Sequence, residues 1–188
     1  MKILGFIGVD GCGKSSIVSS IKERELKSRI AHVHFRPGIL AYRTKGINHM
    51  TEKISVKRAR NQFISEFLVL YYLLDSFLGV LYYYFRGVEI VLWERPLIDL
   101  LVFPERYRLS KVCVTKPLIM LFSKLLFTIL LSGDESLIYS RKKELNVDEI
   151  RHYNKLYMTT SPDLVLNVSL SVIEIRSLIY EAIGSRPC

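Results

Sequence analysis

The feature that most constrains the fold of this chain lies near its start. Residues 8 to 15 read Gly-Val-Asp-Gly-Cys-Gly-Lys-Ser, which matches the phosphate-loop pattern G-x-x-x-x-G-K-[ST]. An apolar run of strand length precedes this segment, and helix-forming residues follow it. Such a loop turns successive backbone N–H groups inward around phosphates, next to a helix N-terminus. The sequence therefore predicts a strand, a phosphate-binding loop and a helix in direct succession.

The residues of this segment predicted to bind the cofactor are Gly8, Gly11, Cys12, Gly13, Lys14, Ser15 and Ser16. Lys14 is expected to reach the β- and γ-phosphates of ATP, and the Ser15 hydroxyl is expected to coordinate Mg²⁺. The alternative is a glycine-rich turn that binds nothing. The glycines, the lysine and the serine all stand in register, which argues against that alternative.

Beyond the loop, apolar runs of strand length alternate with longer helical segments. We expect strands at 2–9, 31–35, 88–93, 126–131 and 164–168, and helices at 14–27, 56–86, after Pro96, and at 134–143, 147–159 and 172–183. Because tight hairpin signals do not separate the strands, a parallel sheet is favoured. The predicted fold class is α/β, a three-layer doubly wound sandwich with a five-stranded parallel sheet (the P-loop NTPase fold), in one domain over residues 1–188.

The composition limits which binding partners and which cellular location the chain is expected to have. The formal net charge of +9 fits nucleic acid, an anionic membrane surface or a phosphorylated ligand. The basic residues are scattered rather than gathered with aromatics, so no nucleic-acid partner is expected. The three cysteines lack metal-ligand spacing, and the first residues lack a signal-peptide pattern. These features favour a reduced, cytoplasmic location.

Two apolar stretches test this interpretation. Residues 67–85 approach the length of a membrane span, but Asp75 lies at their centre. A carboxylate there would cost about 2.5 to 3.5 kcal/mol in a lone span, so a buried core helix is favoured. Residues 117–132 are divided by Lys124 and predict a short helix followed by a strand. Peripheral membrane association and a homodimer both stay open.

Charged or turn-forming segments follow the predicted strands, at the edge where parallel sheets bind ligands. Together with the loop they resemble thymidylate kinase-type members of the nucleoside monophosphate kinase group. The segments that carry the resemblance are residues 8–16, similar to G-x-D-G-x-G-K-[ST]-[ST], Arg36-Pro37-Gly38, similar to R-E-P-G, Glu94-Arg95, similar to D-R-Y, and Arg141-Lys142-Lys143, similar to a basic lid. They occur in the family's order across almost the whole chain.

This resemblance implies transfer of the ATP γ-phosphoryl group to a small-molecule phosphate acceptor, dTMP or a similar nucleotide, with ATP and Mg²⁺ as cofactors. Lys14, Arg95 and Arg141 are implied as the groups that stabilise the transferring phosphoryl group. Asp10 is implied to face a sugar hydroxyl of the acceptor. The resemblance also implies a lid segment near 134–150.

The same resemblance implies the remaining site residues. Arg36 and Arg43 would hold the acceptor phosphate, because a guanidinium fork matches its oxygens. Glu94 would lie near Mg²⁺, through water. The four histidines have no partners in the sequence and are expected to be structural.

Some residues depart from the family pattern. Pro96 replaces the tyrosine of D-R-Y, and the helix that reads thymine in the family has no arginine between Gln62 and Phe85. Residues 94–108 also resemble a subgroup of thymidylate kinase-like proteins found among bacterial surface-polysaccharide genes. A hydroxyl acceptor would need a general base, for which Asp10 and Asp99 are candidates. The alternatives are therefore a kinase of a sugar or polysaccharide-precursor hydroxyl, and a non-catalytic nucleotide-binding or membrane-associated module.

Overall fold

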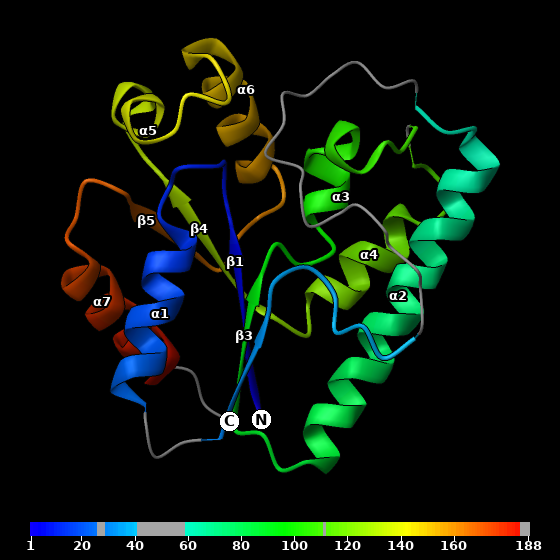
Figure 1. Ribbon diagram of the computed structural model, residues 1–188, viewed down its shortest axis with the longest axis horizontal. Helices are drawn as coiled ribbons and strands as arrows, with labels where there is room; N and C mark the ends of the chain where they lie inside the picture. Colours follow the sequence, from blue (N-terminus) through cyan, green and yellow to red (C-terminus); the bar gives the residue numbers. More distant parts are fainter. Residues whose placement is uncertain (26–28, 41–58, 111, 185–188) are drawn as a thin grey trace.

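A five-stranded parallel sheet forms the centre of the molecule (Figure 1). The computed structural model describes residues 1–25, 29–40, 59–110 and 112–184. The sheet order is β2-β3-β1-β4-β5, with strands β1 (Lys2–Ile7), β2 (Ile30–Val33), β3 (Ile90–Glu94), β4 (Phe127–Ser132) and β5 (Leu164–Asn167). All four strand pairs are parallel. The predicted α/β fold with a five-stranded parallel sheet is confirmed.

Helices cover both faces of this sheet and its carboxyl edge. α1 (Lys14–Arg24) packs against α7 (Val172–Gly184) on one side, whereas α2 (Gln62–Phe85) and α4 (Lys116–Ser123) pack on the other (Figure 1). α3 (Asp99–Val102), the 3-10 turn η1 (Pro104–Tyr107), α5 (Glu135–Arg141) and α6 (Val147–Met158) complete the described elements.

The strands supply a separate hydrophobic core to each side of the sheet. In β3, Leu92 packs in the core that includes α1 and α7, whereas Val91 and Trp93 pack in the core that includes α2 and α4. This alternation follows from the period of two along a strand. The predicted three layers therefore reflect apolar side chains on both faces of each central strand.

Several element boundaries differ from the sequence expectation. β2 ends at Val33 rather than at residue 35, because the chain bends after it and the Trp93 indole donates to the Phe35 carbonyl (2.8 Å). α2 begins at Gln62, where the Asn61 side chain caps it by accepting from Phe63 N. The start expected at residue 56 lies outside the described residues. The segment after Pro96 forms two short helical pieces, α3 and η1.

α2 is long and apolar enough to cross a membrane by length and composition alone. One third of its apolar window is buried in the protein. The expectation of a buried core helix therefore holds for the inner face of α2 and not for its outer face.

Candidate active site

The phosphate loop lies between β1 and α1, at the carboxyl edge of the sheet. Gly8, Gly11 and Gly13 all have positive φ angles, of 134°, 86° and 92°. A Cβ atom at Gly8 would lie 2.5 Å from the Leu131 carbonyl oxygen, so only glycine fits there. Gly13 is the N-cap of α1 and has no side chain to cap it, so the first N–H groups of the helix stay available to an anion.

Lys14 is buried inside this loop. Its ammonium donates to the carbonyl oxygens of Gly8 (2.7 Å) and Val9 (2.8 Å) and lies 3.4 Å from Cys12 Sγ. Because these partners belong to the loop itself, the charge stays at the centre of the curved backbone. This is the position from which it can contact bound phosphate oxygens.

Ser15 and Glu94 bring together two oxygen groups next to the loop. The Ser15 hydroxyl donates to Glu94 Oε2 (2.7 Å), and the other carboxylate oxygen of Glu94 bonds His32 Nε2 (2.8 Å). The described residues contain no group of three or more His, Cys, Asp or Glu that could hold a metal. Mg²⁺, however, is usually held by one or two protein oxygens together with phosphates and waters. The Ser15–Glu94 pair fits that requirement.

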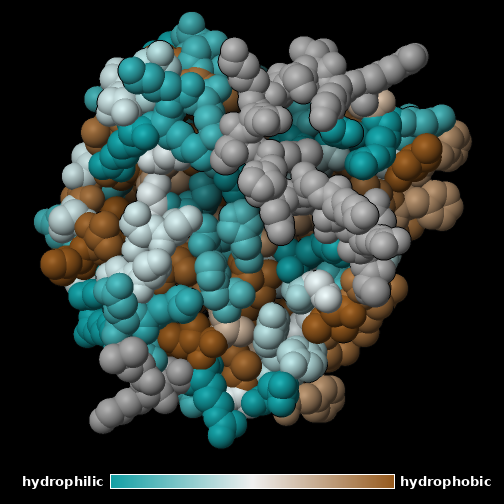
Figure 2. Space-filling model, in the orientation of Figure 1, coloured by the Kyte–Doolittle hydropathy of each residue, from teal (hydrophilic) through white to brown (hydrophobic). Residues whose placement is uncertain are grey.

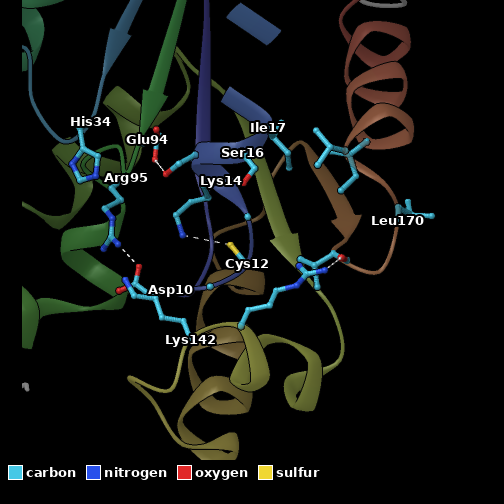
Figure 3. A pocket seen from close by; sticks show the side chains of 17 residues that line it. Asp10, Cys12, Lys14, Ser16, Ile17, His34, Glu94, Arg95, Lys142 and Leu170 are labelled. Atoms are coloured by element: carbon cyan, nitrogen blue, oxygen red, sulfur yellow. Dashed lines mark hydrogen bonds and ion pairs between the residues drawn. The ribbon is translucent and has the colours of Figure 1, made fainter. Parts of the chain in front are cut away.

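A cavity of about 500 Å³ opens over the loop (Figure 3). Residues 10–17 form its floor, and its apolar end is formed by Val168, Leu170, Val172 and Ile175. Its polar walls come from the ends of β2, β3 and α5, and consist of His34, Glu94, Arg95, Arg141 and Lys142. The cavity therefore combines a phosphate-binding floor, several cations and an apolar end able to accommodate a flat ring.

Asp10 is held between two guanidinium groups. It forms an ion pair with Arg95, and Arg106 Nη2 lies 2.5 Å from its other carboxylate oxygen. Burial raises the pKa of Asp10, but the positive charges of Arg95, Lys14 and Lys142 outweigh burial and hold this pKa below its ordinary value. Asp10 is therefore ionised at neutral pH.

The backbone of Arg95 is strained. Its φ angle is +55°, a left-handed backbone conformation that residues other than glycine rarely adopt. Its N–H donates to the Phe6 carbonyl of β1 (3.1 Å), which holds the residue at the sheet edge. Strained residues of this kind often occur at functional sites. The guanidinium of Arg95 points toward Asp10 (Figure 3).

Asp99 lies deeper than Asp10 and does not line the cavity. Tyr107 donates to one of its carboxylate oxygens (2.7 Å), Tyr157 donates to the other, and Arg106 Nη1 lies 3.7 Å away. Burial and the charge of Asp99 raise the pKa of both phenols well above the ordinary value. Arg106 thus links Asp99 to Asp10, and Asp99 itself does not reach the cavity.

The structure brings most of the predicted site residues to one place. Arg141 lines the cavity and donates to the Val168 carbonyl (3.2 Å). Arg36 does not line it. The Arg36 side chain is 11% exposed, lies 3.5 Å from the buried carboxylate of Asp75 and is stacked over Tyr71 and Tyr72. Arg43 lies outside the described residues.

Sequence reasoning missed several residues of the site. Arg106 lies within the segment 94–108, but no pattern there assigns it a role, and it lies 96 residues from its partner Asp10. His34 was expected to be structural but lines the cavity. Burial lowers the pKa of His34 and outweighs the negative charge of Glu94, which raises it, so the imidazole is neutral at pH 7. Its position near the carboxyl end of the second predicted strand, residues 31–35, was the one available signal.

Solved structures share this fold across nearly the whole chain. Deoxyadenosine kinase from M. mycoides with bound dATP has a TM-score of 0.54 and 16% identity, covering 98% of this chain and 100% of its own. The same enzyme with the products dCMP and a flexible dCDP has a TM-score of 0.56 and 15% identity, covering 99% and 100%. The YorR protein from Bacillus subtilis in complex with phosphorylated GDP has a TM-score of 0.56 and 14% identity, covering 97% and 96%.

No family model and no curated protein matches the sequence. At these identities the similarity shows the fold alone. The fold is the P-loop α/β fold that these solved structures share, and thymidylate kinase membership stays a prediction.

Proposed function

We propose that this protein is an ATP-dependent kinase that transfers the γ-phosphoryl group of ATP to a hydroxyl of a nucleoside-class acceptor. The observation that carries the proposal is the cavity over the phosphate loop, which Lys14, Arg95 and Arg141 line together with the Ser15–Glu94 pair. Phosphoryl transfer depends on positioning and charge neutralisation, and these groups supply both.

In this proposal the triphosphate lies along the loop, with Lys14 and the N–H groups of α1 on its oxygens. The base occupies the apolar end formed by Val168, Leu170, Val172 and Ile175. Ser15 and Glu94 would hold Mg²⁺, which neutralises charge on the β- and γ-phosphates when bound. The acceptor oxygen forms a bond to the γ-phosphorus as the bond to the bridging oxygen of ADP breaks, and the proton of the acceptor hydroxyl passes to the Asp10 carboxylate and from there to solvent.

Arg141 and Lys142 belong to the proposed lid segment near 134–150. The end of α5 contacts the loop, since a Cβ atom at Gly11 would lie 3.0 Å from Lys142 Cβ and 3.1 Å from the Ile138 carbonyl oxygen. A lid in this position would bring both cations onto the transferring group. Asp10, which lines the cavity as a carboxylate, would accept a hydrogen bond from the acceptor hydroxyl and orient it.

We take a hydroxyl rather than a monophosphate as the acceptor. A monophosphate acceptor needs a cation for its phosphate, and of the two arginines predicted for that role, Arg36 is paired with Asp75 outside the cavity and Arg43 lies outside the described residues. A deoxyadenosine kinase among the structures of the same fold agrees with a hydroxyl acceptor. Thymidylate, and a sugar or polysaccharide-precursor hydroxyl, are the competing acceptors that the experiment must separate.

The test measures ADP formation from ATP and Mg²⁺ with three panels of acceptors: nucleosides and deoxynucleosides, their monophosphates, and free sugars. We expect stimulation by a nucleoside, and a drop of at least about 100-fold in kcat/KM for Lys14→Met, because the cation on the transferring group is lost. Lys22→Met, at an exposed position of the same helix, is the matched control and should keep full activity.

Each other outcome has a defined meaning. Stimulation by dTMP alone would replace the proposal with a monophosphate kinase, and stimulation by sugars alone would replace it with a sugar kinase. Saturable ATP binding without ADP formation for any acceptor would leave a non-catalytic nucleotide-binding module.

A further inference from the structure

The buried carboxylate of Glu94 accepts hydrogen bonds at both of its oxygens. Ser15 donates to Oε2 (2.7 Å), and His32 Nε2 lies 2.8 Å from Oε1. A carboxylate can only accept, so His32 donates from Nε2. The Glu94 side chain is 3% exposed, so each of its oxygens depends on a protein donor.

The register of the sheet places His32 and Glu94 on one face. His32 in β2 pairs with Leu92 in β3, and Glu94 comes two residues after Leu92. Paired residues of parallel strands point to the same face, and so do residues two apart along one strand. Ser15 reaches this face from the start of α1, which packs on the same side. In Figure 2 hydrophilic residues cross the middle of the molecule, near the carboxyl ends of β2 and β3 in Figure 1.

The other cations around Glu94 have partners of their own. Arg95 forms an ion pair with Asp10, and the Lys14 ammonium donates to carbonyl oxygens of the loop. Within the described part of the chain, His32 is therefore the donor that serves Oε1. Without the His32 N–H, Oε1 would be buried with no donor, and the carboxylate would turn to recover one.

We propose that His32 is a positioning residue for the divalent cation that accompanies ATP. It holds Oε1 of Glu94, which leaves Oε2 directed at the Ser15 hydroxyl and available to the cation. This inference rests on the proposed function, in which Ser15 and Glu94 hold Mg²⁺. Losing a hydrogen-bond partner that orients a metal ligand commonly lowers metal affinity by about 10- to 100-fold.

The experiment measures binding of the non-hydrolysable ATP analogue AMP-PNP by titration calorimetry, once with Mn²⁺ and once with EDTA. The dissociation constant in EDTA divided by that in Mn²⁺ gives the contribution of the cation, which we call the cation ratio. In wild type this ratio should be well above 1. His32→Leu should lower the cation ratio by about 10-fold or more, while the dissociation constant in EDTA stays unchanged.

Three further variants separate positioning from a structural role. His32→Gln should keep most of the wild-type cation ratio, because the glutamine amide places an N–H at about the reach of imidazole Nε2. His32→Asn should lower the ratio as His32→Leu does, because its shorter amide does not reach Oε1. His152→Leu, at an exposed position of α6, is the matched control and should leave both dissociation constants unchanged.

Circular dichroism should show that each variant is folded, and if His32→Leu is not, the comparison of His32→Gln with His32→Asn decides. A wild-type cation ratio in His32→Leu and His32→Asn would overturn the proposal. An equal loss of affinity with and without Mn²⁺ would also overturn it, since the role of His32 would then be structural. A ratio of 1 in the wild-type protein would show that Ser15 and Glu94 hold no cation and would overturn it as well.

This measurement needs neither an acceptor nor turnover. Failure of the kinase proposal is recognised separately, by the absence of ADP formation with every panel of acceptors. The two proposals can therefore fail independently.

Discussion

At the scale of single residues, Arg106 connects two carboxylates with different roles. Asp10 lines the cavity, whereas Asp99 is fully buried behind it, and Arg106 lies between them at 2.5 Å and 3.7 Å. Removing one partner of a buried ion pair is costly, because the remaining charge loses its compensation. Arg106 therefore stabilises the polar side of the cavity without lining it.

Arg106→Met is expected to lower the free energy of unfolding by about 3 kcal/mol, since Asp10 and Asp99 lose a shared cation. Urea denaturation measures the change, and Arg106→Lys should restore part of it. Arg151→Met is the matched control, because Arg151 pairs with Glu135 and Asp148 at the surface, where such pairs contribute less than about 1 kcal/mol. Equal effects of Arg106→Met and Arg151→Met would contradict this role.

At the scale of elements, Glu66 joins α2 to the start of α4. Its carboxylate accepts from the backbone N–H groups of Cys113 (2.7 Å), Val114 (2.9 Å) and Thr115 (3.0 Å), and from the Thr115 hydroxyl (2.6 Å). Burial raises the pKa of Glu66, but these hydrogen bonds outweigh burial and lower this pKa to about 2. The side chain thus supplies the acceptors that helix α4 needs at its N-terminus.

Glu66→Gln should destabilise the protein by about 1 to 2 kcal/mol at pH 7, because a charged acceptor and one of its oxygens are lost. The pKa of Glu66 is depressed in the folded state. Its contribution is therefore present above the ordinary pKa of 4.5 and is lost as the pH falls through about 2.

Unfolding by urea at pH 7 and at pH 3 should consequently show a smaller difference between Glu66→Gln and wild type at pH 3. Glu181→Gln, on the exposed side of α7, is the control and should change stability by less than about 0.5 kcal/mol at either pH. If the difference in unfolding free energy between Glu66→Gln and wild type were the same at pH 7 and pH 3, the proposed role of the Glu66 charge would be disproved.

At the scale of the whole molecule, α3, η1 and α6 meet at Asp99. Tyr107 comes from η1, and Tyr157 comes from α6, 58 residues away in the chain. α6 also packs on α3 and on β4. Both phenols donate to Asp99 only while protonated, so this junction depends on their raised pKa values.

Stability should therefore fall as the pH rises above 10. A raised pKa in the folded state gives stability that is fully present below the unfolded value of about 10 and is lost through the folded value. Each phenol contributes up to about 1.4 kcal/mol per pH unit to the fall of the unfolding free energy with pH. Tyr157→Phe should reduce the slope of unfolding free energy between pH 10 and 11, whereas Tyr139→Phe on α5 should keep the wild-type slope. If the unfolding free energy fell with the same slope in wild type, Tyr157→Phe and Tyr139→Phe, the role given to the Tyr157 phenol would be refuted.

The sequence by itself determined the phosphate loop and the parallel α/β fold. Both are encoded in neighbouring residues: glycines where the backbone must take positive φ, a lysine and serine at fixed offsets, and apolar runs of strand length. It also placed Arg95 and Glu94 at the edge of the sheet, because charges directly after a buried strand must lie there.

Only the tertiary structure decided which distant side chains meet and which helix face is exposed. Arg36 pairs with Asp75 rather than lining the cavity, and Arg106 reaches Asp10, since packing between elements rather than sequence spacing brings these groups together. α2 is apolar nearly all round, so its composition could not select a buried face. The contacts of Asp75 and Gly79 with residues 37–40 made that selection, because a buried carboxylate requires hydrogen-bond donors and a close helix approach requires glycine.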